Sequence, residues 1–194
     1  MSSNNVKQKI IEAAIQCIEA EGLQGATIRK IAQLAEVNVA AINYHFGSKK
    51  QLFNIVLNST LNESFVNNIQ DYEDLWISDT KKALQFFLED TVQGAINYPN
   101  LTKAHLMESF IKGDFNTDSV IKINDFLTDL HNLIQKILPF EYEIERKLAI
   151  IQLFSSFLMI GMMPNIYQRF LGTEMKNVEI QKKFVEVLIK NYIN

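Results

Sequence analysis

The stretch ATIRKIAQLAEVNVAAINYHFGSKKQL, from Ala26 to Leu52, begins with a short helical pattern. Ile28, Ile31 and Ala35 repeat at the spacing of one helix face. Thr27 stands directly before this pattern, and threonine is a favourable N-cap because its hydroxyl accepts a hydrogen bond from the first turn. We therefore predict a helix of about two turns after Thr27.

A second short helix is predicted over Val39–Phe46, after a three-residue turn. Asn38 is a natural N-cap for this helix, and Gly47 ends it. Ser48 and Gln51 have the S-x-x-Q spacing of a capping box, which starts a further helix. Two short helices, a tight turn and a flanking helix make a helix-turn-helix pattern.

The predicted helix Val39–Phe46 has two different faces. Ile42 and Phe46 are four residues apart and share the face that packs inward, where Val37 can join them. The opposite face carries small, polar or amphipathic side chains, as a helix needs if it is to enter a major groove. These outward side chains are Ala40, Ala41, Tyr44 and His45, with Asn43 on the flank.

Four side chains around this helix are candidates to contact phosphates. Tyr44 and His45 can donate hydrogen bonds at its C-terminal end. Lys49 and Thr27 each stand at a helix start, where free N–H groups attract anions. Taken singly, each residue is better explained by packing or solvation, but their coincidence in one short segment favours a phosphate clamp.

The charge is divided unevenly along the 194 residues, whose net charge is −3. Residues 1–50 hold six Lys/Arg against four Glu, a net of +2, so the remainder nets −5. A basic head on an acidic body presents the head to a polyanion.

These motifs resemble the DNA-binding segment of the TetR (tetracycline-repressor) family of bacterial transcriptional regulators. The family form runs T-hydrophobic-x-x-I-A-x-x-A-x-V-S/N, then Y-x-H-F-x-x-K-x-x-L/I, and the similarity covers about residues 6–57. The resemblance implies an all-α chain in which an N-terminal three-helix helix-turn-helix domain precedes a C-terminal helical ligand-binding and dimerisation domain. We place the division at 1–57 and 58–194. It further implies a repressor that leaves a palindromic operator when a small molecule binds.

Carried over by motif position, the resemblance assigns two sets of DNA contacts. The phosphate contacts are Thr27, Tyr44, His45 and Lys49, and the base contacts are Asn38, Val39, Ala40, Ala41 and Asn43. The chain departs from the family form at Asn43, since an aromatic or other residue is common there. Asparagine pairs bidentately with adenine, so we hypothesise that Asn43 reads an A·T pair in each half-site. The alternative is that Asn43 only caps or packs.

The body is expected to be helical near Thr80–Tyr98, Leu101–Lys112 and Thr117–Leu138, and over two further segments, Glu143–Met163 and Val178–Ile193. Glu143–Met163 includes a run that is apolar nearly all round, so it must be covered on both sides. The resemblance implies that these last two helices form the interface of a homodimer. The alternative is a central helix in a monomeric bundle.

An effector pocket is also implied by the resemblance. A small amphipathic or apolar molecule is expected, held in an apolar cavity with a few polar anchors. The candidate lining residues are Phe86, His105, Met107, Phe110, Phe126, Met159, Met163 and Tyr167. For most of these the competing interpretation is an ordinary core position.

Other functional classes find less support. The sequence contains no P-loop, Rossmann glycine pattern, G-x-S-x-G or CxxC motif, so we expect neither an enzyme nor a cofactor or metal site. The single cysteine, Cys17, excludes an internal disulfide and fits a cytoplasmic location, and no stretch is long and apolar enough to span a membrane. A helical protein-interaction module that keeps the fold without operator binding is the remaining alternative.

Overall fold

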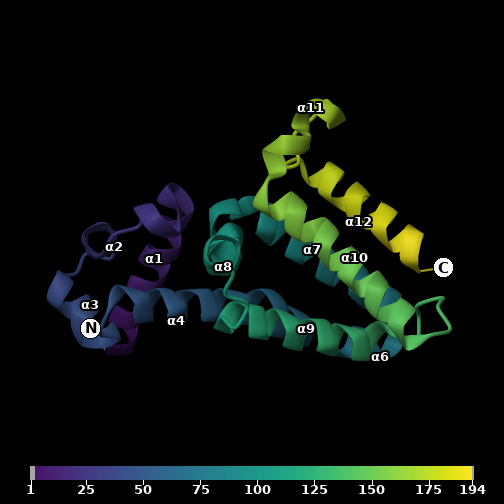
Figure 1. Cartoon of the computed structure of the whole chain (residues 1–194), viewed down its shortest axis with the longest axis horizontal. Coiled ribbons are helices and arrows are strands. Elements are labelled where there is room, and N and C mark those ends of the chain that lie inside the picture. Colours follow the sequence, from purple (N-terminus) through teal and green to yellow (C-terminus); the bar gives the residue numbers. More distant parts are fainter. Residues whose placement is uncertain (1–2, 194) are drawn as a thin grey trace. The chain divides into compact units, whose positions relative to one another are not determined.

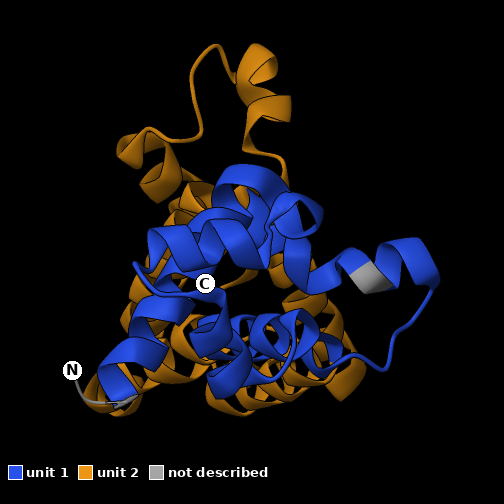
Figure 2. Cartoon of the chain, turned by 90° about the vertical axis from the view of Figure 1, so that its left-hand side faces the viewer, with its two compact units in different colours: residues 1–60, 100–120 blue, residues 61–99, 121–194 orange. Residues whose placement is uncertain are grey.

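The computed structural model describes residues 3–193, with the side chains of Ser3 and Glu108 left out. The described residues form helices and connecting turns without a strand, which confirms the all-α prediction. The two units into which the chain divides are residues 1–60 with 100–120, and residues 61–99 with 121–194 (Figure 2). The predicted domain boundary between residues 57 and 58 stays a prediction. The first compact unit extends to residue 60 and also includes residues 100–120.

The first unit contains the predicted helix-turn-helix. Its helices are α1 (Ser3–Gly25), α2 (Ile28–Leu34), α3 (Val39–Phe46), most of α4 (Lys49–Leu61) and α8 (Pro99–Lys112) (Figure 1). In α1 the backbone leaves helical geometry at Gly22, whose φ of 72° lies in the left-handed region that glycine tolerates best.

α8 joins this unit through both its N-terminus and its apolar face. A Glu19 carboxylate oxygen accepts hydrogen bonds from the backbone N–H groups of Asn100 and Leu101, each at 3.0 Å. Leu101 and Ala104 then pack into the core beneath α1–α4. The Glu19 bonds join residues about 80 positions apart, and Leu101 and Ala104 add apolar packing. These interactions explain why the unit is discontinuous in sequence.

The chain leaves the first unit inside a helical run. α4 continues into a π-helical turn, η1 (Asn62–Asn67), and then into α5 (Asn68–Asp71). A short helix, α6 (Glu73–Ser78), follows. The sequence analysis set no bounds for these three segments, because helical periodicity continues past α4 without a clear stop signal.

The second unit is built around α7 (Thr80–Asn97), which packs against α6, α10 (Glu143–Met162) and α12 (Val178–Tyr192) (Figure 1). α9 (Asp118–Ile134) contributes Phe126, which stacks on Phe65 of η1 with ring centroids 4.0 Å apart. Phe126 also lies 5.7 Å from Phe87 and 6.2 Å from Phe154, so one aromatic cluster joins four helical segments.

The expected helices of the body agree with α7, α8, α9, α10 and α12 to within a few residues, except that α9 ends at Ile134 rather than Leu138. Between α10 and α12 lie two short segments, η2 (Pro164–Tyr167) and α11 (Gln168–Leu171). No single helix among residues 3–193 has the length and apolar composition of a membrane span; α10 with Pro164–Leu171 meets those criteria only as a pair bent by 94°.

Candidate nucleic-acid interface

Side-chain caps fix the starts of α2 and α3. The Thr27 hydroxyl oxygen accepts a hydrogen bond from the Lys30 backbone N–H at 3.3 Å, and Asn38 Oδ1 accepts one from the Ala41 N–H at 2.7 Å. Both predicted N-caps are therefore confirmed. The Thr27 hydroxyl hydrogen and the Asn38 Nδ2 group remain available as donors to DNA, whereas Asn38 Oδ1 is already engaged.

The turn between α2 and α3 uses an unusual backbone conformation. Glu36 has a φ of 56°, in the left-handed region that is uncommon for residues other than glycine. Its neighbour Val37 donates a backbone hydrogen bond to the Ala32 carbonyl at 3.0 Å and packs on the core. Sequence patterns do not reveal this conformation, since glutamate has no special preference for it.

α3 turns one face to the core and the other to solvent, as predicted. Ile42 and Phe46 are buried beneath α1, α2 and α4. Val39, Ala40, Asn43 and Tyr44 are exposed, and Ala41 is partly exposed. The predicted base contacts thus lie on an accessible helix surface, and their role in reading bases stays a prediction.

The predicted phosphate contacts lie at the C-terminal end of α3 and at the start of α4. Tyr44 is 85% exposed, and its ring meets the partly buried His45 edge-on at 5.0 Å. Lys49 Nζ lies 5.0 Å from the centroid of the Phe53 ring, a cation–π distance. The phenol hydroxyl is therefore fully available, while Lys49 is held by an aromatic side chain of its own helix.

Half of the predicted capping box is present at the start of α4. Ser48 Oγ accepts a hydrogen bond from the Gln51 backbone N–H at 3.2 Å and lies 3.4 Å from Gln51 Oε1. The Gln51 side chain therefore bonds the serine hydroxyl instead of the backbone. Gly47, which precedes the box, has a φ of 74°, so glycine suits the corner between α3 and α4.

Three further cations, in α2 and α4, were not among the predicted DNA contacts. Arg29 and Lys50 are exposed, and Lys30 is exposed but forms an ion pair with Glu21. Their signal in the sequence was the net charge of the head, which does not distinguish one cation from another.

The eight residues predicted to line an effector pocket are divided between the two units. His105, Met107 and Phe110 belong to the first unit, and the other five belong to the second. Phe110 is 70% exposed, and Met159 and Met163 are also exposed. Tyr167 and Phe86 are partly buried, the latter with its ring 5.8 Å from that of Tyr72. Of the eight, only Phe126 lines a cavity described here.

That cavity is a groove of about 470 Å³ within the second unit, between the η1–α5 segment and α9. Its floor contains the stacked rings of Phe65 and Phe126. Polar groups stand at its edge, where Lys122 Nζ donates to Asn62 Oδ1 at 2.6 Å. The apolar lining residues are Leu61, Phe65, Val66, Ile69, Phe126 and Leu133. Leu61, Phe65 and Ile69 recur every four residues, so their helical spacing is the sequence signal that could have indicated this lining.

The N-terminal segment and the whole fold each have known counterparts. Residues 10–56 match the family model described as bacterial regulatory proteins, tetR family. The transcriptional repressor AcnR of Corynebacterium efficiens is 39% identical over 49 residues, which are 25% of this chain and 26% of AcnR. Alignments with such curated relatives span only about a quarter of their length, 22% for the YttP regulator of Bacillus subtilis.

Solved structures share the fold over the whole chain. A Mesorhizobium loti protein of the TetR family has a TM-score of 0.72 at 19% identity, with 100% of both chains covered. The regulator FadR from Bacillus subtilis, solved with stearoyl-CoA, has a TM-score of 0.64 at 18% identity and covers 94% of this chain and 97% of its own. The capped helix-turn-helix of residues 27–51 lies inside the matched segment, so this part of the chain is similar to the tetR family of bacterial regulatory proteins.

Proposed function

We propose that this protein is a ligand-responsive DNA-binding transcriptional regulator, a repressor that binds a palindromic operator as a homodimer in the cytoplasm. The observation that carries the proposal is the solvent-facing side of α3, with Asn43 and Tyr44 exposed between capped helix starts. This surface offers donors and acceptors to base edges and phosphates. No catalytic role is assigned to it.

An exposed apolar stripe on α10 supports the dimer. Ile144, Leu148, Ile151 and Met159 are exposed and recur at intervals of three, four or eight residues, which is one helix face. On α12 the exposed Val187 follows the partly buried Ile180 and Phe184 at helical spacing. Covering such faces favours a two-fold symmetric pair, which also supplies the two recognition helices that a palindrome requires.

The groove beside η1 supports a small amphipathic effector. Its volume of about 470 Å³ falls within the usual range for small-molecule sites, and it combines an aromatic floor with a polar edge. FadR, which shares the fold, was solved with the amphipathic molecule stearoyl-CoA. We assign the effector to this groove and not to the dispersed set of residues expected from the sequence.

The π-helical turn offers a route for coupling. η1 forms one wall of the groove and continues from α4, which begins at Lys49. π-helical turns are rare and occur frequently at functional sites. An effector that changes this turn would change which arrangements of the two DNA-binding domains of the dimer are populated, and so weaken operator binding. Operator binding must then weaken effector binding by the same factor.

The DNA-binding proposal is tested by selecting random double-stranded DNA on the purified full chain at physiological salt. We expect enrichment of a palindrome whose complex weakens steeply as salt rises, because lysines release counterions from phosphates. Lys49→Gln should reduce the salt slope by about one per subunit. The matched control is Lys190→Gln, an exposed lysine near the end of α12, which should leave the slope unchanged.

Binding that ignores both sequence and salt, with a folded dimer confirmed, would refute the proposal and favour the protein-interaction module. Enrichment with a normal salt slope in both lysine variants would keep the DNA function but remove Lys49 as a phosphate contact.

The groove is tested with the neutral apolar dye Nile red. Val66→Trp places a bulky side chain in the groove and should abolish the fluorescence increase that the dye shows with the unaltered protein. Ile77→Trp adds the same side chain at an exposed position of α6 outside the groove and should leave the signal intact. Equal dye binding by both variants would remove the groove as the effector site.

A further inference from the structure

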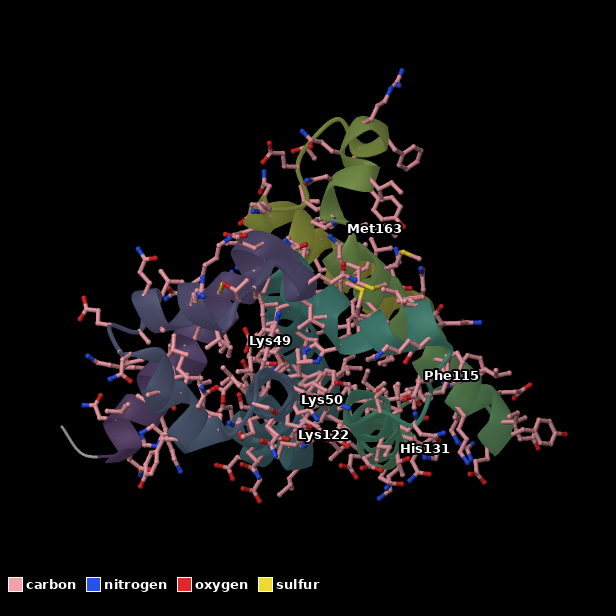
Figure 3. All side chains as sticks on the ribbon, turned by 60° about the vertical axis from the view of Figure 1, so that its left-hand side comes forward. Lys49, Lys50, Phe115, Lys122, His131 and Met163 are labelled. Atoms are coloured by element: carbon pink, nitrogen blue, oxygen red, sulfur yellow. The ribbon has the colours of Figure 1, made fainter. Side chains whose placement is uncertain are left out.

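A second cavity, of about 530 Å³, lies between α9 and α10 in the same unit as the groove. His131 and Arg146 line it from the two helices, and Asn132 borders both cavities. Figure 3 labels His131 and Lys122, which come from the same helix but line different cavities. The second cavity is more polar than the groove.

Two buried nitrogen atoms at this cavity have no hydrogen-bond partner among the described residues. His131 is 9% exposed, and its Nε2 atom is fully buried without a partner. Arg146 Nε is also buried without a partner. Buried polar atoms are nearly always paired, because leaving one unpaired forfeits its hydrogen bonds to water. Arg146 Nε can only donate, and His131 Nε2 also donates in the tautomer that carries its proton, so one acceptor group would satisfy both nitrogens.

The Arg146 guanidinium is fixed in place by the loop before α10. Its Nη1 atom donates to the Phe140 and Glu141 carbonyl oxygens at 2.9 and 2.8 Å. These bonds hold the group but leave the edge that carries Nε unused. A guanidinium edge matches the planar, two-oxygen geometry of a carboxylate.

The charges around the cavity favour one negative charge. Lys147 and Glu143 form an ion pair at 2.6 Å, and Lys147 lowers the pKa of Glu143, with smaller contributions from His131 and Arg146. The Glu143 carboxylate is thus already paired, and the positive charge of Arg146 is left over. Arg146 also lies in the first turn of α10, where the helix dipole favours anions.

We propose that this cavity binds a small organic monocarboxylate, whose oxygens accept hydrogen bonds from His131 Nε2 and Arg146 Nε. Leu127 and the buried Ile150, which also line the cavity, provide an apolar surface for its short hydrocarbon tail. A monoanion neutralises the single unpaired charge, whereas a phosphate dianion exceeds it. This site goes beyond the proposed function, because it lies outside the effector groove and needs no DNA.

The experiment is a calorimetric titration of the full chain, free of DNA, with hexanoate. Hexan-1-ol has the same carbon chain without the charge, and inorganic phosphate has charge without the chain. We expect saturable binding of hexanoate and at least tenfold weaker binding of the other two. His131→Leu and Arg146→Lys should each weaken hexanoate binding at least tenfold, while Arg169→Lys, an exposed arginine of α11, should not change it.

If a variant fails to fold, the ¹⁵N resonances of the His131 imidazole in the unaltered protein test whether hexanoate contacts this side chain. Hexanoate should shift the Nε2 signal. Hexanoate binding that leaves this signal in place, equal affinity for hexan-1-ol, or full affinity in folded His131→Leu would overturn the proposal. Stronger binding of phosphate would overturn the carboxylate assignment.

Discussion

At the scale of the residue, Asn43 is the position where the helix-turn-helix segment departs from the motif that it resembles. Its side chain is exposed on α3, and no capping bond to it is found among the described residues. The packing interpretation thus loses support, and an asparagine free on a recognition helix can pair with adenine. Asn43→Ala should lose about 1–3 kcal/mol of discrimination at one base pair per half-site. Competition binding with operators substituted at each position measures this.

Tyr44→Phe is the matched control for Asn43→Ala, because it removes one exposed hydroxyl from the same helix. It should weaken all operators to the same extent, since phosphate contacts do not read sequence. If Asn43→Ala also weakens all operators uniformly, Asn43 is not a base reader.

His105 gives the fold a specific dependence on pH. Burial lowers its pKa to about 4, and its ring lies near two hydroxyls, with Nε2 3.3 Å from Thr60 Oγ1 and Nδ1 3.5 Å from Ser119 Oγ. In the unfolded chain a histidine pKa is about 6.5, so between these values the unfolded state binds a proton that the folded state excludes. Stability should therefore be level above pH 6.5 and fall by at most about 3 kcal/mol toward pH 4.

Urea unfolding from pH 7.5 to 4.5 tests this dependence. His105→Gln should flatten the part of the profile below pH 6.5, whereas Ser119→Ala keeps the titrating ring and should retain the slope. An unchanged slope in His105→Gln would assign the acid sensitivity to other groups.

At the scale of the element, a side-chain cap fixes the start of α3, the helix that we propose reads the DNA. Asn38 Oδ1 accepts the Ala41 N–H at 2.7 Å, and an N-cap substitution to alanine typically costs about 1 kcal/mol. Asn38→Ala should lower the free energy of unfolding by about that amount, whereas Asn38→Ser, which keeps a capping oxygen, should lower it by only a few tenths. Denaturant unfolding without DNA measures both, and equal losses in the two variants would show that the cap is not the cause.

η1 forms one wall of the groove, although its own residues do not predict a π-helical turn. Its six residues are assembled between α4 and α5 without a break, and its Phe65 side chain stacks on Phe126, about sixty residues later in the chain. Helical periodicity continues through this region, so the sequence carries no mark of the π turn. The turn and the groove beside it depend on this long-range packing.

At the scale of the whole molecule, the proposed operator binding requires assembly into a homodimer. Leu148 lies within the exposed stripe of α10, and a glutamate there places a charge on the face that we propose is buried in the dimer. Leu148→Glu should convert the protein to a 22.3 kDa monomer with greatly weakened binding to the palindrome. Light scattering coupled to gel filtration measures the mass.

Ile77→Glu adds the same charge at an exposed position of α6 and should remain dimeric. A dimer in both variants would place the interface elsewhere, and monomers in both would point to a general effect of added charge.

Short-range signals in the sequence predicted the caps Thr27 and Asn38, the inward pair Ile42 and Phe46, and most helices of the body. These features depend on hydrogen bonds and periodicities that span three or four residues, so the local sequence determines them. The groove of Phe65 and Phe126, the cavity of His131 and Arg146, and the addition of residues 100–120 to the first unit required the tertiary structure. Each depends on side chains from separate helices meeting, and helical periodicity predicts which face of a helix is buried but not which residues lie against it.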